Sequence, residues 1–372
     1  MRVALISPLF ESVPPRLYGG TERVIYNLCR GLIESDIEVT VFASGDSAVD
    51  GKLVPVIDEA FRLRKNPVSD TIPYNLKMLE MVARQADEFD VIHNHHDYWM
   101  LPLSEMTRTP LLTTLHGRLD LPDISEAFYS YPNTGFVSIT DAQRTPMSRL
   151  RWLRTVHHGI DPKSFQFYEK PGNYLAFLGR MDATKRPDLA IQIAKESGVP
   201  LKIAAKIEGA EMQLYYDTFV KPHVDGKFIE YVGEICEAEK SDFLGNAYAL
   251  VFPIDWPEPF GLVMIEALAC GTPVLARPIG SVPELLENGL TGFIDLDARI
   301  LAKRVQDIPK ISRKKCRQWV EDRFSLERMT EDYIHVYRHL TDFAAARNKE
   351  DRLDRRGRHQ LHSLERFAHG NS

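Results

Sequence analysis

Two glutamates, Glu258 and Glu266, stand eight positions apart in residues 252–274, the stretch of this sequence that says most about chemistry. Its apolar start predicts a buried strand, the prolines that follow predict a turn, and a helix is expected from about Gly261. The first backbone N–H groups of a helix lack partners within it and its dipole favours negative charge, so a diphosphate suits this position. Glu266, inside the helix, could accept hydrogen bonds from ribose hydroxyls, while Glu258 on the loop could meet the hydroxyls of a sugar.

The elements that must position this stretch follow a repeating pattern of short apolar strands and amphipathic helices. In the first half, a strand at 3–6 precedes a helix at 21–32, and further strands are expected at 37–42, 54–57, 90–93, 111–115 and 135–139. In the second half, strands are expected at 174–178, 201–205, 229–231, 249–252 and 273–276, with a helix at 187–196. Short buried strands that alternate with helices indicate parallel sheets covered on both faces. Turn-forming residues at 158–170 mark the junction of two α/β domains.

Composition narrows the class of protein. The chain has 372 residues, 44% of them apolar and 26% charged, which is typical of a globular protein with more than one core. A net charge of -6 gives no polyanion-binding signature, so no nucleic acid partner is expected. The four cysteines lack paired spacing, which predicts neither disulfides nor a zinc site and fits a reducing compartment. No apolar stretch is long enough to span a membrane, so we expect a cytoplasmic protein without a transmembrane segment.

Several short motifs, together with the paired glutamates, resemble one known family. In chain order they are Gly19-Gly20-Thr21, Leu115-His116-Gly117, His158-Gly159-Ile160-Asp161, Leu178-Gly179-Arg180 with Lys185, Glu258 to Glu266, Pro283-Glu284 and the run 288–293. This series resembles the retaining family 4 glycosyltransferases, also described as glycosyltransferase group 1, whose signature is E-x7-E. The match extends from residue 3 to about 340, and the ordered series is far more specific than a lone pair of glutamates.

The resemblance implies the GT-B fold, in which two Rossmann-like domains face each other across a central cleft. The N-terminal, acceptor-side domain would span residues 1–165 and the C-terminal, nucleotide-sugar-binding domain residues 166–325. A helix at 326–345 would pack back on the N-terminal domain, and 346–372 would form a polar tail.

The resemblance also implies the roles of individual residues. The nucleotide-sugar-binding set would be Gly19, Gly20, Arg180, Lys185, Glu258, Pro259, Phe260, Gly261, Leu262 and Glu266. The catalytic set would be His116, Arg180, Lys185 and Glu258, with no protein nucleophile, because the donor phosphate helps to deprotonate the acceptor on the same face. Arg180 offers a planar fork to phosphate oxygens and Lys185 a movable point charge, and both would offset the negative charge of the leaving diphosphate. His116 would hydrogen-bond the donor sugar.

The expected partners are a nucleotide sugar donor, UDP- or GDP-linked, and an acceptor that is a small molecule, a glycan or a lipid-linked compound. Neither a metal nor a cofactor is expected, and the oligomeric state is open. The basic and apolar segment 149–154 could touch an anionic membrane surface peripherally. Two departures from the family could alter donor choice, because Arg186 stands where the family usually has Gly, and Ser281 follows Gly280 in place of a second Gly.

Alternative functions share these residues. The same fold could serve a sugar-nucleotide epimerase, a phosphorylase, or a catalytically silent nucleotide-sugar-binding protein. A dinucleotide oxidoreductase is disfavoured, because no G-x-G-x-x-G follows the first strand. The run 93–97 contains metal-ligand residue types, but alternate side chains of a strand point to opposite faces. The acidic pair at Asp295 and Asp297 predicts ordinary capping residues rather than a metal site.

Overall fold

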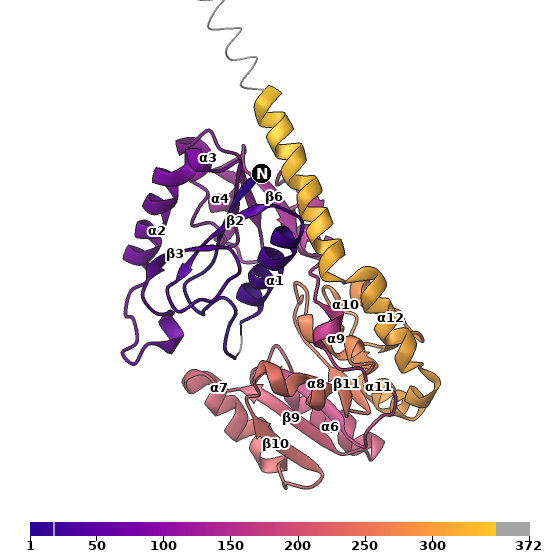
Figure 1. Cartoon of the computed structure of the whole chain (residues 1–372). Helices are drawn as coiled ribbons and strands as arrows, with labels where there is room; N and C mark the ends of the chain where they lie inside the picture. The colour runs from indigo at the N-terminus through magenta and orange to yellow at the C-terminus, as the bar shows by residue number, and fades with distance from the viewer. Residues whose placement is uncertain (18, 347–372) are drawn as a thin grey trace, which may run out of the picture.

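The structure, a computed structural model, describes residues 1–17 and 19–346 and contains two parallel β-sheets flanked by helices (Figure 1). The first sheet has seven strands in the order β3-β2-β1-β4-β5-β6-β7, and the second has six in the order β10-β9-β8-β11-β12-β13. Neighbouring strands are parallel throughout both sheets. The predicted α/β fold of two Rossmann-like units is confirmed.

The first sheet is built around a strand that is buried on both faces. Its strands are β1 (Arg2–Ile6), β2 (Glu38–Ser44), β3 (Lys52–Ile57), β4 (Val91–Asn94), β5 (Leu111–Thr114), β6 (Gly135–Ser138) and β7 (Trp152–Thr155). The helices of this half are α1 (Gly20–Glu34), α2 (Ile72–Gln85), α3 (Leu103–Met106), α4 (Ile124–Tyr129) and α5 (Asp141–Arg144). Residues 3–6 of β1 are fully buried, as a central parallel strand requires. The sequence does not predict β7, because this edge strand is only half-buried and Arg154 interrupts its apolar residues.

The second sheet repeats this plan. Its strands are β8 (Leu175–Arg180), β9 (Leu201–Lys206), β10 (Ile229–Gly233), β11 (Ala249–Phe252), β12 (Val274–Ala276) and β13 (Gly292–Ile294). The helices of this half are α6 (Pro187–Ser197), α7 (Gly209–Tyr215), α8 (Glu237–Gly245), α9 (Leu262–Ala269), α10 (Val282–Leu285), α11 (Ala298–Arg304) and α12 (Arg313–Arg323).

In both sheets the strand order reverses at the first strand of the unit, at β1 between β2 and β4 and at β8 between β9 and β11. In open α/β sheets, ligands bind beyond the carboxyl ends of the strands at such a reversal. The loop that ends at Gly19 follows β1, and Arg180 is the last residue of β8. The topology therefore places both predicted phosphate-binding segments where a ligand is expected.

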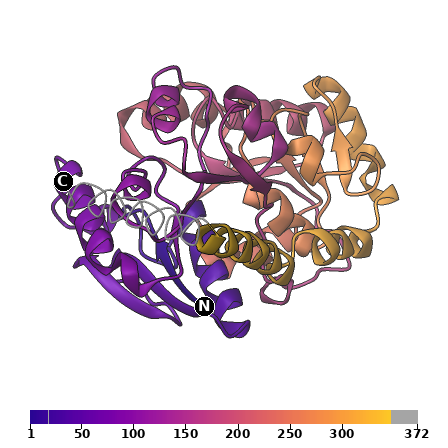
Figure 2. The same ribbon diagram turned by 90° about the horizontal axis from the view of Figure 1, so that it is seen from above.

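The last described helix, residues 326–346, returns from the second unit and lies against α1 in both views (Figures 1 and 2). Tyr333 and Tyr337 are fully buried and share a hydrophobic cluster with Leu28 of α1 and with β1. The two helices approach so closely at Gly31 that a Cβ built there would lie 2.0 Å from Thr330 Oγ1, so only glycine fits. The polar tail expected at 346–372 lies, beyond residue 346, outside the described residues.

Candidate active site

A cavity of about 680 Å³ lies between the two halves of the molecule and is lined by residues of both halves. The lining includes every residue predicted for nucleotide-sugar binding and catalysis: Gly19, Gly20, His116, Arg180, Lys185, Glu258, Pro259, Phe260, Gly261, Leu262 and Glu266. Motifs that are far apart along the chain therefore meet around one space.

Lys185 and Glu258 form an ion pair in the wall of this cavity. Lys185 is 9% exposed and Glu258 8% exposed, and the ammonium group donates a hydrogen bond to Glu258 Oε2. Trp256 Nε1 donates to the same oxygen over 2.8 Å, and the Lys185 ammonium lies 5.2 Å from the centre of the Trp256 ring. At the end of β8, Arg180 Nε donates to Asp182 over 2.7 Å. The two predicted diphosphate-binding cations are thus oriented by neighbouring carboxylates.

The loop that leads into α9 is held in one shape by backbone contacts. Gly261 precedes the helix at φ 86, a left-handed conformation that favours glycine. Gly280 lies so close behind this loop that a built Cβ would be 2.5 Å from Glu258 N. The Ser281 backbone N–H donates to Glu258 O over 2.9 Å and its hydroxyl to Phe260 O over 2.5 Å. Ser281, a departure from the family, therefore braces the donor loop.

Arg186, the other departure, also has a structural reason. Its φ of 57 lies in the left-handed region, where a glycine is expected. The guanidinium holds this conformation through Nε to Asp188, at 2.9 Å, and through Nη1 to Asp255, at 3.0 Å. The substitution exchanges glycine's conformational freedom for two ion pairs beside the cavity.

Glu266 is 3% exposed and accepts a hydrogen bond of 2.8 Å from Lys240 on α8. Lys240 also pairs with Glu237 over 3.0 Å, and Glu237 pairs with Arg23 of α1 over 2.9 Å. A line of alternating charges thus connects the predicted ribose-binding carboxylate to the opposite half of the molecule. No motif marks Lys240, which the sequence shows only as one charge on a charged helix.

The N-terminus of α1 lies across the cavity from the N-terminus of α9. A Cβ built on Gly20 would meet Leu262 Cδ1 at 3.8 Å, and one on Gly19 would lie 2.6 Å from Pro15 Cβ. Gly20 begins α1 and Leu262 begins α9. Both helix dipoles therefore direct their positive ends at the same space.

Glu22, in the first turn of α1, lines the cavity and is 5% exposed. Burial raises the pKa of its carboxyl from 4.5 to about 7. A hydrogen bond from its own backbone lowers this pKa, the nearby Glu11 raises it, and Arg62 lowers it, but burial is the largest of these effects. Because the folded protein holds this proton more tightly than the unfolded chain, ionisation lowers stability as pH rises from 4.5 through 7.

We expect Glu22→Gln to remove this pH dependence. Its free energy of unfolding should match that of the wild type near pH 4.5 and exceed it by about 3 kcal/mol at pH 8. Denaturant unfolding at both pH values measures the difference. Glu34→Gln, an exposed change at the other end of α1, is the matched control. A difference between variant and wild type that is the same at both pH values would contradict the assignment.

His116 follows β5 on a loop whose backbone is held by Gln143. The Gln143 side-chain amide donates to Leu115 O over 2.9 Å and to Gly117 O over 2.8 Å, one carbonyl on each side of His116. Burial lowers the pKa of His116 to about 3, so its ring is neutral at physiological pH. Gln143, which no motif marks, is therefore part of the structure that places His116.

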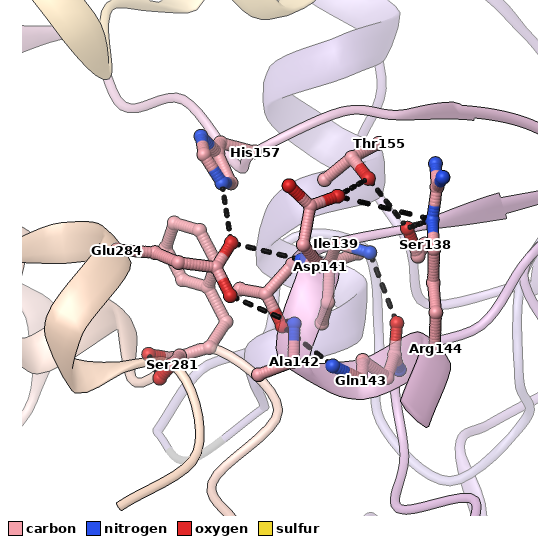
Figure 3. A network of polar contacts seen from close by, with 12 residues as sticks. Ser138, Ile139, Asp141, Ala142, Gln143, Arg144, Thr155, His157, Ser281 and Glu284 are labelled. Atoms are coloured by element: carbon pink, nitrogen blue, oxygen red, sulfur yellow. Dashed lines mark hydrogen bonds and ion pairs between the residues drawn. The ribbon is translucent and has the colours of Figure 1, made fainter. Parts of the chain in front are cut away.

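Glu284 joins the two halves beside this loop (Figure 3). Its carboxylate accepts hydrogen bonds of 2.8 Å from Asp141 N and Ala142 N at the start of α5, and one of 3.1 Å from His157 Nε2. Burial alone would raise the pKa of Glu284, but these hydrogen bonds lower it and hold it below its usual value. Just ahead of α5, the Thr140 hydroxyl donates to Pro259 O over 2.9 Å. α5 thus contacts the donor loop, the His116 loop and Glu284.

The patterns weighed as metal or membrane sites have other contacts. His93 and His95 pack against each other with ring centres 3.9 Å apart, whereas the Asn94 side chain binds the backbone of Asp97 and His96. The predicted alternation of faces is confirmed.

The acidic pair and the basic segment likewise have partners within the chain. Asp297 accepts from the Arg299 backbone at the start of α11, which confirms a capping role. The guanidinium groups of the basic segment lie over Tyr129 (Arg149), over Phe343 (Arg151) and against Asp332 (Arg154). Membrane contact by this segment stays a prediction. Among residues 1–17 and 19–346, no helix is both long and apolar enough to cross a membrane.

Two Rossmann-like units around a shared cavity define the GT-B class of protein. A family model described as glycosyl transferases group 1 matches residues 161–323, and one described as glycosyltransferase family 4 matches residues 18–188. Together they extend over most of the chain, which belongs to these glycosyltransferases.

The proteins to which this chain is similar include a named glycosyltransferase. The D-inositol 3-phosphate glycosyltransferase of Mycolicibacterium smegmatis is 26% identical over 339 residues, covering 74% of this chain and 75% of that protein. An uncharacterized 41.2 kDa protein from the cps region of Klebsiella pneumoniae is 27% identical over 170 residues, and this match spans 46% of that protein and 44% of this chain. Among solved structures, sucrose-phosphate synthase from Thermosynechococcus elongatus has a TM-score of 0.75 at 20% identity, covering 92% of this chain and 99% of its own.

Proposed function

We propose that this glycosyltransferase moves a hexose-type sugar from a UDP- or GDP-sugar to an acceptor, with retention of anomeric configuration and without a metal ion. The observation that carries the proposal is the cavity between two opposed helix N-termini, where Arg180 and Lys185 add positive charge. These groups suit a diphosphate, whose negative charge grows as its bond to the sugar breaks. We also propose the cytoplasm as its location, since all four cysteines are unpaired.

In the proposed reaction the bond between the anomeric carbon and the diphosphate oxygen breaks, and the acceptor oxygen bonds to that carbon from the same face. The acceptor proton passes to the leaving diphosphate. Arg180, Lys185 and the first N–H groups of α9 stabilise the leaving group, and Glu258 and His116 hold the sugar. The acceptor is a small molecule, a glycan or a lipid-linked compound.

A thermal-shift panel of UDP, GDP and ADP and their sugars tests the proposal, because a ligand that binds only the folded form raises the melting temperature. A shift with one nucleotide and its sugar is expected. The absence of a shift with any of them would overturn it. Turnover of the donor without an acceptor would favour an epimerase, and binding without turnover would favour a silent binding protein. Activity that is lost in EDTA and restored by manganese would overturn the proposed independence of metal.

We expect Glu266→Gln to weaken binding of the nucleotide about 10- to 100-fold, because a charged hydrogen-bond acceptor for the ribose is lost. Isothermal titration measures the dissociation constant. Removing the 2′-hydroxyl from the nucleotide should weaken binding to the wild type but not to the variant, which separates a ribose contact from a general disturbance of the Lys240 pair. Equal affinity of both proteins for the intact nucleotide would contradict the ribose role.

A further inference from the structure

Four histidine rings form a column that leads from the first sheet to the wall of the cavity. Successive ring centres are 3.9 Å apart for His93 and His95, 5.1 Å for His95 and His116, and 5.2 Å for His116 and His158. Both nitrogens of His93 have partners, Nδ1 with the Tyr337 hydroxyl at 2.7 Å and Nε2 with Thr114 Oγ1 at 2.8 Å. This histidine column therefore extends from the C-terminal helix to the cavity, which both His116 and His158 line.

Within the histidine column, His95 and His116 share a hydrogen bond of 2.8 Å between His95 Nδ1 and His116 Nε2. His95 is 1% exposed, and burial lowers the pKa of both rings, that of His116 to about 3. Both rings are neutral at physiological pH, so each carries one N–H and one lone pair. The shared bond then allows only two arrangements of protons.

The surroundings of the other His95 nitrogen decide between these arrangements. His95 Nε2 is buried and has no hydrogen-bond partner in the described part of the chain. If His116 donated the shared bond, His95 would carry its proton on Nε2, as a buried N–H without an acceptor. If His95 donates, Nε2 carries only a lone pair. Buried N–H groups without partners are the rarer case, so donation by His95 is favoured.

We propose that His95 is a positioning residue that holds His116 as the tautomer protonated on Nδ1. No described residue bonds His116 Nδ1, and His116 lines the cavity. His116 then offers an N–H donor to an oxygen of the bound donor and has no lone pair with which to accept a proton from the acceptor. This inference rests on the proposed function for its consequence, but the tautomer itself does not depend on it.

The tautomer can be read directly, without any substrate. Long-range ¹H–¹⁵N correlation spectra of protein labelled at histidine distinguish protonated from bare ring nitrogens, and loss of signals in His116→Ala assigns the ring. We expect a protonated Nδ1 and a bare Nε2 for His116 in the wild type, and a mixture of tautomers in His95→Leu. A protonated Nε2 on His116 in the wild type would overturn the proposal. A correct tautomer in a protein that binds no nucleotide would instead overturn the proposed function.

Kinetics with the substrates found by the thermal-shift panel test the consequence. We expect His95→Leu to lower kcat by about 10- to 100-fold, the usual effect of removing a group that orients a functional side chain, while nucleotide affinity stays within about twofold. His95→Asn, whose side-chain amide can still donate from near the Nδ1 position, should restore most of this loss. In a His116→Ala background, His95→Leu should cost less than about twofold more. If His95→Leu lowered kcat by the same factor in the His116→Ala background as in the wild type, His95 would not act through His116.

Discussion

Lys185→Ala is expected to lower kcat by about 10²-fold or more, the largest single effect foreseen for this enzyme. Lys185 is 9% exposed, and its ammonium group lies in the cavity wall beside the loop that precedes α9. As the bond to the sugar breaks, negative charge accumulates on the diphosphate, and a fixed cation in a partly dehydrated site stabilises it more than water does. Initial rates at saturating donor measure the loss. Lys185→Arg should not restore the rate fully, because a planar guanidinium does not replace a compact ammonium.

The same change removes the ammonium partner of the buried Glu258 carboxylate and leaves the Trp256 N–H as its hydrogen-bond donor among the described side chains, so the protein also loses stability. Lys185→Met combined with Glu258→Gln removes both charges and should regain stability without regaining rate. Lys195→Ala, an exposed change on α6, is the control for removing a lysine from the same half. A variant that loses only thermal stability and keeps its kcat would show that Lys185 is a structural ion-pair residue.

His116→Ala is expected to lower turnover by about 10²-fold and to lower the thermal stability far less. The loop does not depend on the imidazole, since Gln143 holds the backbone carbonyls of Leu115 and Gly117. Removing the ring takes away a donor to the ligand and the partner of His95, but it leaves these two backbone bonds. Measurements of kcat and melting temperature on the same samples test this.

Gln143→Leu is the comparison for the His116 change. It leaves two backbone carbonyls without their amide donor, so stability and turnover should fall together. If His116→Ala lowered stability and turnover as Gln143→Leu does, His116 would be a core residue without a role in the reaction.

The predicted site residues gather around one cavity because most of the motifs that contain them follow the carboxyl ends of parallel strands. Arg180 ends β8, and the Glu258 loop follows β11, so the parallel sheets bring both to one edge. Apolar runs such as residues 3–6 predict the central strands for the same reason that they are buried, since both faces of a parallel sheet are covered.

Residues whose role depends on a partner distant in the chain could not be predicted. Lys240 and Gln143 carry no local pattern, and each acts through a group more than twenty positions away. Glu284 belongs to a recognised motif, but nothing near it in the sequence shows that it binds the start of α5, 143 positions away. The left-handed backbone conformation of Arg186 could not be predicted for a related reason. Its left-handed backbone depends on Asp188 and on Asp255 of another loop, whereas propensity alone would demand a glycine there.

The C-terminal helix has a consequence for the order in which this protein can be made. His93 bonds Tyr337 and Thr114 bonds Tyr333, contacts that span 244 and 219 positions. During synthesis the second sheet can assemble before residues 326–346 have been made, but until then the first sheet keeps an uncovered face. Contacts between such distant residues slow folding and expose apolar surface meanwhile. The half synthesised first is therefore the half completed last.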